Sequence, residues 1–77
     1  MTTATNMQHD ADEVLLAFAR AVRAAGVPVT HDRSASFLEA TALVGLGDVA
    51  AVRTAGHATL CAGPDDLHRF DQVFEAF

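Results

Sequence analysis

The sequence has one cysteine, Cys61, and no long apolar run among its 77 residues. A single cysteine excludes an internal disulfide, and nothing in its use indicates an oxidising compartment. Residues 1–9 lack the basic start and apolar stretch of a signal peptide, and no segment has the roughly 18 consecutive apolar residues of a membrane span. These absences predict a soluble, cytoplasmic protein that has no membrane partner.

Basic residues are also few. The chain has five Lys and Arg residues in total and ten Asp and Glu residues, which gives a formal net charge of −5. Such a chain is repelled by phosphate backbones and by anionic lipids. A nucleic-acid partner is therefore disfavoured.

Small apolar residues are abundant in the sequence. Hydrophobic residues make up 51% of the chain, but many are alanines, and the bulky ones are chiefly Phe, Leu and Val. Small residues allow helices to approach closely while a few large ones interlock, and no segment alternates as a half-buried strand would. We expect an all-α fold, a compact bundle of four short helices over residues 10–77, preceded by a flexible lead over residues 1–9.

The first helix is predicted from Asp10 to Ala25. Asp10 is suited to cap its free amides, Glu13 completes a capping box, and Gly26 is placed to end it. Its expected inward face comprises Leu15, Phe18, Ala19 and Val22.

A second helix is predicted over residues 31–44, after an extended connector that Pro28 imposes and with Thr30 as its cap. Leu43 widens its apolar stripe, so we expect this helix to be the most buried. The inward face predicted for it comprises Phe37, Leu38, Thr41 and Val44.

The third helix is predicted over residues 49–62, after a turn in which Gly45 ends one helix and Asp48 caps the next. Gly56 in its middle lowers helix propensity by about 1 kcal/mol, which favours close approach of another helix at that point. The expected inward positions are Val49, Val52, Ala55 and Leu60.

The fourth helix is predicted to begin at Pro64, after Gly63 and with two acidic residues in its first turn. It has the clearest amphipathic pattern of the chain, with Leu67 followed by Phe70, Val73, Phe74 and Phe77. Large aromatic residues at the last positions need a neighbour. We therefore predict a possible interaction surface at Phe70, Val73, Phe74 and Phe77, with Phe70 and Phe74 turned inward and Phe77 marking where a partner docks.

Two groups of polar residues invite a catalytic or metal-binding interpretation. His57 and Cys61 lie four residues apart on one predicted helix, but a structural zinc site needs four ligands, and His31 and His68 would have to converge from elsewhere. A second group, Asp65, Asp66, His68 and Asp71, pairs carboxylates with an imidazole but has no nucleophile. We expect no catalytic, cofactor or metal site and no enzyme activity, while a small metal-dependent catalyst at His57 and Cys61 remains a distant alternative.

A helix-turn-helix DNA-binding regulator is the main alternative function. The second and third predicted helices are joined by Gly45, Leu46, Gly47 and Asp48, and such turns often contain glycine. The recognition helix would offer only Arg53 and His57 as polar readers, which together with the acidic charge disfavours this function.

Three stretches in order resemble the amino-terminal helical region of CoxE-like proteins that contain a von Willebrand factor A (VWA) domain. They are LLAFARAVRAAGVPVTHDR, FLEATALVGLGDVAAV and AGHATLCAGPDDLHRFDQVFEAF. The resemblance implies a non-catalytic accessory protein whose partner is a MoxR-type AAA+ ATPase or a target metalloenzyme, such as molybdenum-containing carbon monoxide dehydrogenase, in metalloenzyme maturation. It also implies a following VWA domain that holds the metal site. The Asp-x-Ser-x-Ser signature of that domain is not in this sequence, so no metal-binding residue is carried over.

Overall fold

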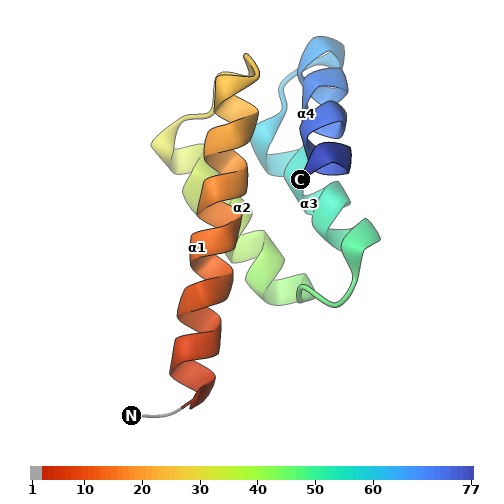
Figure 1. Ribbon diagram of the computed structural model, residues 1–77. Coiled ribbons are helices and arrows are strands. Elements are labelled where there is room, and N and C mark those ends of the chain that lie inside the picture. Colours follow the sequence, from red (N-terminus) through yellow and green to blue (C-terminus); the bar gives the residue numbers. More distant parts are fainter. Residues whose placement is uncertain (1–2) are drawn as a thin grey trace.

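The chain folds as four α-helices joined by short connections (Figure 1). The computed structural model describes the backbone of residues 3–77 and the side chains of residues 11–77. The helices are α1 (Thr3–Ala24), α2 (His31–Val44), α3 (Val49–Leu60) and α4 (Pro64–Ala76). No strand occurs in this described part, so the predicted all-α bundle of four helices is confirmed.

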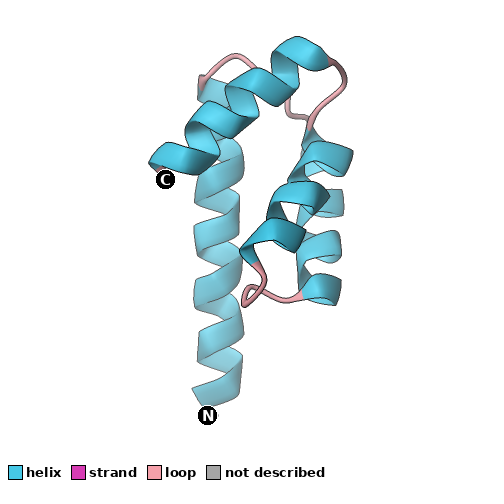
Figure 2. Cartoon of the chain, turned by 90° about the vertical axis from the view of Figure 1, so that its right-hand side faces the viewer, coloured by secondary structure: helices cyan, strands magenta, loops and turns pink. Residues whose placement is uncertain are grey.

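The helices run alternately up and down, so the connections gather at two ends of the bundle. The α2–α3 turn lies at one end, and the α1–α2 and α3–α4 connections lie at the other (Figures 1 and 2). We call these the turn end and the connector end. Figure 2 shows α4 running obliquely and crossing α1 in the half of that helix nearer the connector end.

The residues that begin and end the helices are largely those that the sequence predicted. Thr30 accepts a hydrogen bond from the Arg33 amide at the start of α2, and Asp48 accepts one from the Ala51 amide at the start of α3. Gly45 has a φ of 83°, a left-handed conformation that suits glycine, and its amide donates to the Thr41 carbonyl to close α2. Pro64 begins α4 directly after Gly63.

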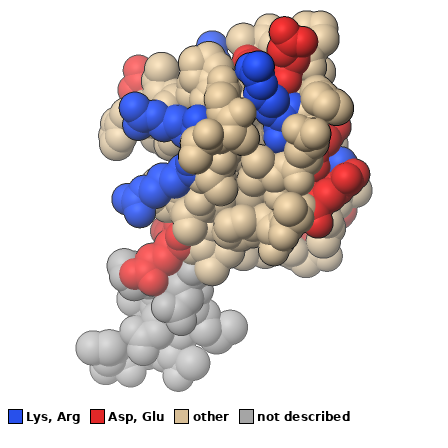
Figure 3. All heavy atoms as spheres, turned by 45° about the horizontal axis from the view of Figure 1, so that its top comes forward, with Lys and Arg blue, Asp and Glu red and all other residues tan. Residues whose placement is uncertain are grey.

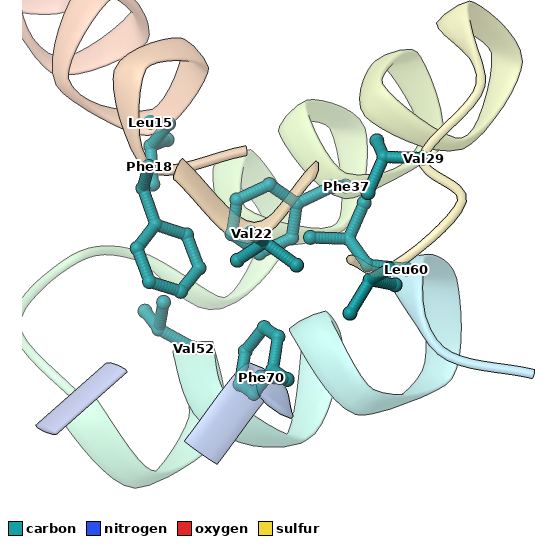
Figure 4. Packing of buried hydrophobic residues seen from close by; sticks show 9 residues of the cluster. Leu15, Phe18, Val22, Val29, Phe37, Val52, Leu60 and Phe70 are labelled. Atoms are coloured by element: carbon teal, nitrogen blue, oxygen red, sulfur yellow. The ribbon is translucent and has the colours of Figure 1, made fainter. Parts of the chain in front are cut away.

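The core lies where all four helices and the α1–α2 connection meet (Figure 4). Its large side chains include Phe37, Leu60 and Phe70, which are all fully buried. Val27 and Val29, on either side of the exposed Pro28, also face inward. The buried hydrophobic residues are Leu15, Phe18, Ala19, Val22, Val27, Val29, Phe37, Val52, Ala55, Leu60 and Phe70.

Two predicted helix boundaries are wrong. Helix α1 begins at Thr3 and runs through Asp10, so Asp10 is not at its N-cap position. The predicted flexible lead therefore overlaps α1, while its residues 1–2 lie outside the described part of the chain. Helix α3 ends at Leu60, two residues early, because Cys61 already has an extended backbone.

The predicted burial of α2 is also wrong. Only Phe37 and Thr41 are buried in this helix, while Leu43 is 88% exposed and Val44 is exposed too. Val49, expected on the inward face of α3, is 63% exposed. All three lie near the turn end, where α4 covers the other helices only in part, so the inward helix stripes are incompletely buried there.

Candidate functional site

An apolar groove opens where α1, the start of α3 and the end of α4 approach one another. It has a volume of about 240 Å³. Its lining comes from three helices and consists of Val14, Leu15, Phe18, Val49, Val52, Phe74 and Phe77. We refer to these seven residues as the apolar groove. Every one of them is hydrophobic, so the groove is suited to an apolar group and has no side chain for acid-base chemistry.

The groove has a buried floor and an exposed rim. Leu15, Phe18 and Val52 are buried and belong to the core. Val14 is 54% exposed, and Val49 and Phe77 are each 63% exposed. The groove is therefore one place where the core reaches the surface.

Phe18 organises the aromatic side chains around the groove. Its ring centroid lies 5.3 Å from that of Phe70, 5.8 Å from that of Phe74 and 5.3 Å from that of Phe77, each in an edge-to-face arrangement. Phe70, Phe74 and Phe77 follow one face of α4 because their spacing of four and three residues matches the helical repeat. One residue of α1 thus contacts the whole aromatic face of α4.

The four residues of the predicted interaction surface differ in how deeply they are buried. Phe70 is fully buried and so belongs to the core, as its expected inward orientation implies. Phe74 and Val73 are half-buried and pack against the core, and Phe74 also lines the groove. Phe77 is the most exposed of the four. Val14 and Val49 complete the rim. Neither was among the interaction-surface residues predicted from the sequence.

Four polar side chains join α3 to α4 beside the groove. One carboxylate oxygen of Asp71 lies 3.1 Å from Arg53 Nε and 2.7 Å from His57 Nε2, and Arg53 Nη2 lies 3.3 Å from Glu75 Oε1. The hydrogen bond with His57 and then that with Arg53 hold the pKa of Asp71 below its usual range, against an opposing effect of desolvation. We call Arg53, His57, Asp71 and Glu75 the α3–α4 ion cluster.

This cluster reaches the groove through Phe74. The guanidinium carbon of Arg53 lies 5.1 Å from the centroid of the Phe74 ring, a cation–π distance. The hydrogen bonds that Arg53 donates to Asp71 and Glu75 raise the pKa of Arg53, so its positive charge is retained over the ring. The cluster therefore holds one wall of the groove in place.

These pairs were not predicted from the sequence, although their spacing carries a signal. Arg53 and His57 are four residues apart on α3, and Asp71 and Glu75 are four apart on α4, so each pair shares one helix face. Two such faces of opposite charge are complementary when their helices are adjacent. What the sequence could not show is that α3 and α4 meet at these faces.

Two of the residues considered for chemistry make hydrogen bonds within the fold. His57 Nε2 is bonded to Asp71, and Asp66 accepts a hydrogen bond from the Ala62 amide before α4. Burial, followed by the charges of Asp66 and Asp71, raises the pKa of the Cys61 thiol to about 11, which opposes formation of a metal-binding thiolate. Within the described residues, no three His, Cys, Asp or Glu side chains are grouped as metal ligands would be.

The DNA-binding alternative gains no support from the structure. Arg53 and His57, its two proposed readers, are directed at Asp71 of α4 and not at an open surface. A recognition helix needs such side chains free to reach base edges. Separately, none of the helices in residues 3–77 has the length and apolar character needed to cross a membrane.

The fold and the groove thus define a small all-α bundle that has an apolar surface site. Comparison with protein families is consistent with this class. The family model of the CoxE N-terminal helical bundle domain matches residues 15–77, which is most of the chain, and the protein belongs to this family. No curated protein and no solved structure matches the chain.

Proposed function

We propose that this helical bundle is a non-catalytic protein-interaction module of a cytoplasmic CoxE-type accessory protein. In this proposal it acts with a MoxR-type AAA+ ATPase in the maturation of a metalloenzyme of the carbon monoxide dehydrogenase type. Membership of the CoxE N-terminal family supports the accessory role. The observation that carries the interaction role is the apolar groove and its exposed rim.

The exposed rim is costly for so small a protein. Burial of apolar surface contributes about 25 cal/mol per Å², and a chain of this size has little hydrophobic burial to spare. Val14, Val49 and Phe77 nevertheless stay more than half exposed around one groove. Apolar side chains gathered in this way are typical of a surface that a partner covers.

The groove is also suited to binding because its walls are fixed before a partner arrives. Phe74 is held between the Phe18 ring and the Arg53 guanidinium, and Arg53 is in turn bonded to Asp71 and Glu75. A binding surface that is already ordered loses less conformational entropy when a complex forms.

Binding measurements with the protein that carries this domain test the proposal. The probes are the cognate MoxR-type ATPase and the target metalloenzyme, each titrated by isothermal calorimetry. We expect Phe77→Ala and Val49→Asp to weaken the complex, since both residues are exposed on the rim. Leu67→Ala is the matched control because Leu67 is exposed on α4 but does not line the groove. Failure of both probes to bind, or equal binding by all variants, would overturn the proposal.

A further inference from the structure

We propose that the cleft between α1 and the start of α2 binds an acidic segment of a partner protein, one that carries both carboxylate and apolar side chains. The inference goes beyond the proposed function, because this surface is separate from the apolar groove. Two observations carry it. One is a pair of arginines that have no partner among the described residues, and the other is the apolar floor of the cleft that they line.

The cleft separates α1 from the residues that begin α2, and its volume is about 300 Å³. Arg20 and Arg23 line it from α1, and their spacing of three residues places both on one face of that helix. Thr30 and His31 line the opposite side, where α2 begins. None of the residues that line the cleft is acidic, so its permanently ionised side chains carry only positive charge.

The two arginines of the cleft are not neutralised within the fold. Both side chains are exposed, and neither forms a hydrogen bond or an ion pair with any residue that the structure describes. Arg53, in contrast, is bonded to Asp71 and Glu75. The helix dipole favours a cation in the last turn of α1, which accounts for Arg23 but not for Arg20. Like charges three residues apart on one helix repel, and an anionic partner offsets this repulsion.

Two further arginines lie at the connector end. Arg33 Nη1 lies 3.5 Å from the Pro28 carbonyl oxygen, and the Arg69 side chain lies beside Gly26. Asp32 is the acidic residue in the first turn of α2, but it does not line the cleft. In Figure 3, two basic side chains project side by side from one edge of the molecule. Because salt limits the reach of exposed charges to about 8 Å, nearby arginines outweigh distant carboxylates of this acidic chain.

The floor of the cleft is apolar. Leu16 is half-buried, and Ala19 and Val29 are buried, and all three line the cleft together with the arginines. A phosphate backbone would meet the arginines and leave this apolar surface in contact with water. A peptide segment that has acidic and apolar side chains covers both, and clusters of arginine are a common means of recognising acidic motifs.

The cleft is also too open to enclose a small molecule. Sites for small molecules bury most of the surface of the ligand. Arg20, Arg23, Thr30 and His31 are all exposed, so an occupant remains open to solvent on one side. Such a cleft receives a few side chains of a larger chain, and the charge of its arginines makes that segment acidic.

Fluorescence anisotropy with the intact protein and labelled synthetic peptides tests the inference. The probe is a peptide in which glutamates flank leucines, with serines as spacers. One comparison peptide has glutamine in place of every glutamate, and another has serine in place of every leucine. We expect the probe to bind most tightly and its affinity to fall as salt is raised, because salt screens exposed charges.

A matched pair of variants locates the contact. The double variant Arg20→Gln and Arg23→Gln removes the two charges that line the cleft. The control variant Arg33→Gln and Arg69→Gln changes the net charge equally at the connector end, at positions that do not line the cleft. We expect the first variant to bind the probe about tenfold more weakly and the control to bind within about threefold of the wild type.

Charge reversal tests the same contact in a second way. The double variant Arg20→Glu and Arg23→Glu should reject the probe and should bind a peptide that has lysine in place of every glutamate. Binding of this reversed peptide shows that the variant is folded and that the cleft holds the charged groups. If circular dichroism shows the variant to be folded and the reversed peptide still does not bind, the inference is wrong.

Several other results would overturn the inference. Equal binding of the glutamine peptide would show apolar contact alone, and equal binding of the serine peptide would show attraction by charge alone. Tighter binding of duplex DNA than of the probe would assign the arginines to a nucleic acid. A dimer in sedimentation experiments that Arg20→Gln and Arg23→Gln dissociate would assign the cleft to a second copy of this chain.

The inference and the proposed function fail separately. If the cognate ATPase or the target enzyme binds in a Phe77-dependent way and the probe does not bind, the proposed function stands and this inference fails. If the probe binds through the two arginines and neither protein binds, this inference stands and the proposed function fails. Loss of probe binding in Phe77→Ala, but not in the arginine variant, would place the peptide in the apolar groove.

Discussion

Gly56 of α3 lies directly against the ring of Phe70 of α4. A Cβ atom at position 56 would lie 2.5 Å from Phe70 Cε2 and closer still to Cζ, with Phe37 Cε1 at 3.4 Å on another side. Atoms cannot approach so closely without displacing the ring, and the Phe70 ring is fully buried in a close-packed core. The glycine therefore allows α3 and α4 to approach, as its position in the middle of a predicted helix indicated.

Gly56→Ala should destabilise the bundle, although alanine is the better helix former. Overpacking a core costs about 1–3 kcal/mol, and the gain in helix propensity returns up to about 1 kcal/mol. We expect a net loss of up to about 2 kcal/mol in the free energy of unfolding, measured by urea denaturation. Gly47→Ala is the control because a Cβ there meets nothing within 4 Å. An increase in stability for Gly56→Ala would contradict the packing described above.

The substitutions Phe70→Ala and Phe77→Ala should have different effects on stability, because Phe70 is a core residue and Phe77 lies on the rim of the groove. Removal of the fully buried Phe70 ring leaves a cavity and should cost about 3–5 kcal/mol, which is enough to unfold much of so small a protein. Phe77 is largely exposed and loses mainly its edge-to-face contact with Phe18, so its replacement should cost about 1 kcal/mol. Thermal unfolding followed by circular dichroism measures both. Equal losses would mean that Phe77 is part of the core.

The fold was predictable where local chemistry decides it. Thr30, Asp48 and Pro64 each mark a helix start because a capping oxygen or a fixed φ acts within a few residues. The start of α1 was not predictable in this way, because Asp10 lies in a stretch that the helix simply continues through. A good capping residue indicates where a helix is able to begin, but it does not force one to begin there.

The site was predictable only in part, because it is assembled from three helices. Periodicity placed Phe74 and Phe77 on the apolar face of α4, and Phe77 was expected to be open to a partner. Val49 was predicted on the inward face of its helix, and Val14 was not part of the inward face predicted for α1. Which turns of a stripe are covered depends on helix lengths and crossing directions, and α4 covers only part of α1 and α3 (Figure 2).

Asp71 should make the stability of the bundle depend on pH in acid. Its pKa is lowered in the folded state by the hydrogen bonds with His57 and Arg53. A lowered carboxyl pKa stabilises the fold above the unfolded value of about 3.9, and this contribution is lost as pH falls through the folded value. We expect stability to decline as pH is lowered from about 5 to 2, and Asp71→Asn to flatten this decline.

The control for this measurement is Glu39→Gln, which removes an exposed carboxylate from α2. Urea denaturation at a series of pH values gives the free energy of unfolding for each variant. Wild type and Glu39→Gln should show parallel acid limbs, with Asp71→Asn less steep than both. An Asp71→Asn profile as steep as that of the wild type would show that the α3–α4 ion cluster does not hold the two helices together.

Cys61 should react slowly with thiol reagents while the bundle is folded. Burial, together with the charges of Asp66 and Asp71, raises its pKa to about 11, so the reactive thiolate is scarce at neutral pH. In the unfolded chain the thiol titrates near its ordinary value of about 8.5. Between these two values only the unfolded state ionises, and the free energy of unfolding should therefore fall as pH rises through this window.

Alkylation by iodoacetamide, followed by mass spectrometry, should be slow at pH 8 for the folded protein and much faster in urea. The Asp66→Asn variant should react somewhat faster than the wild type because one negative charge near the thiolate is gone. Folded protein that is alkylated at pH 8 as fast as the urea-unfolded chain would show that Cys61 is not shielded beside α4.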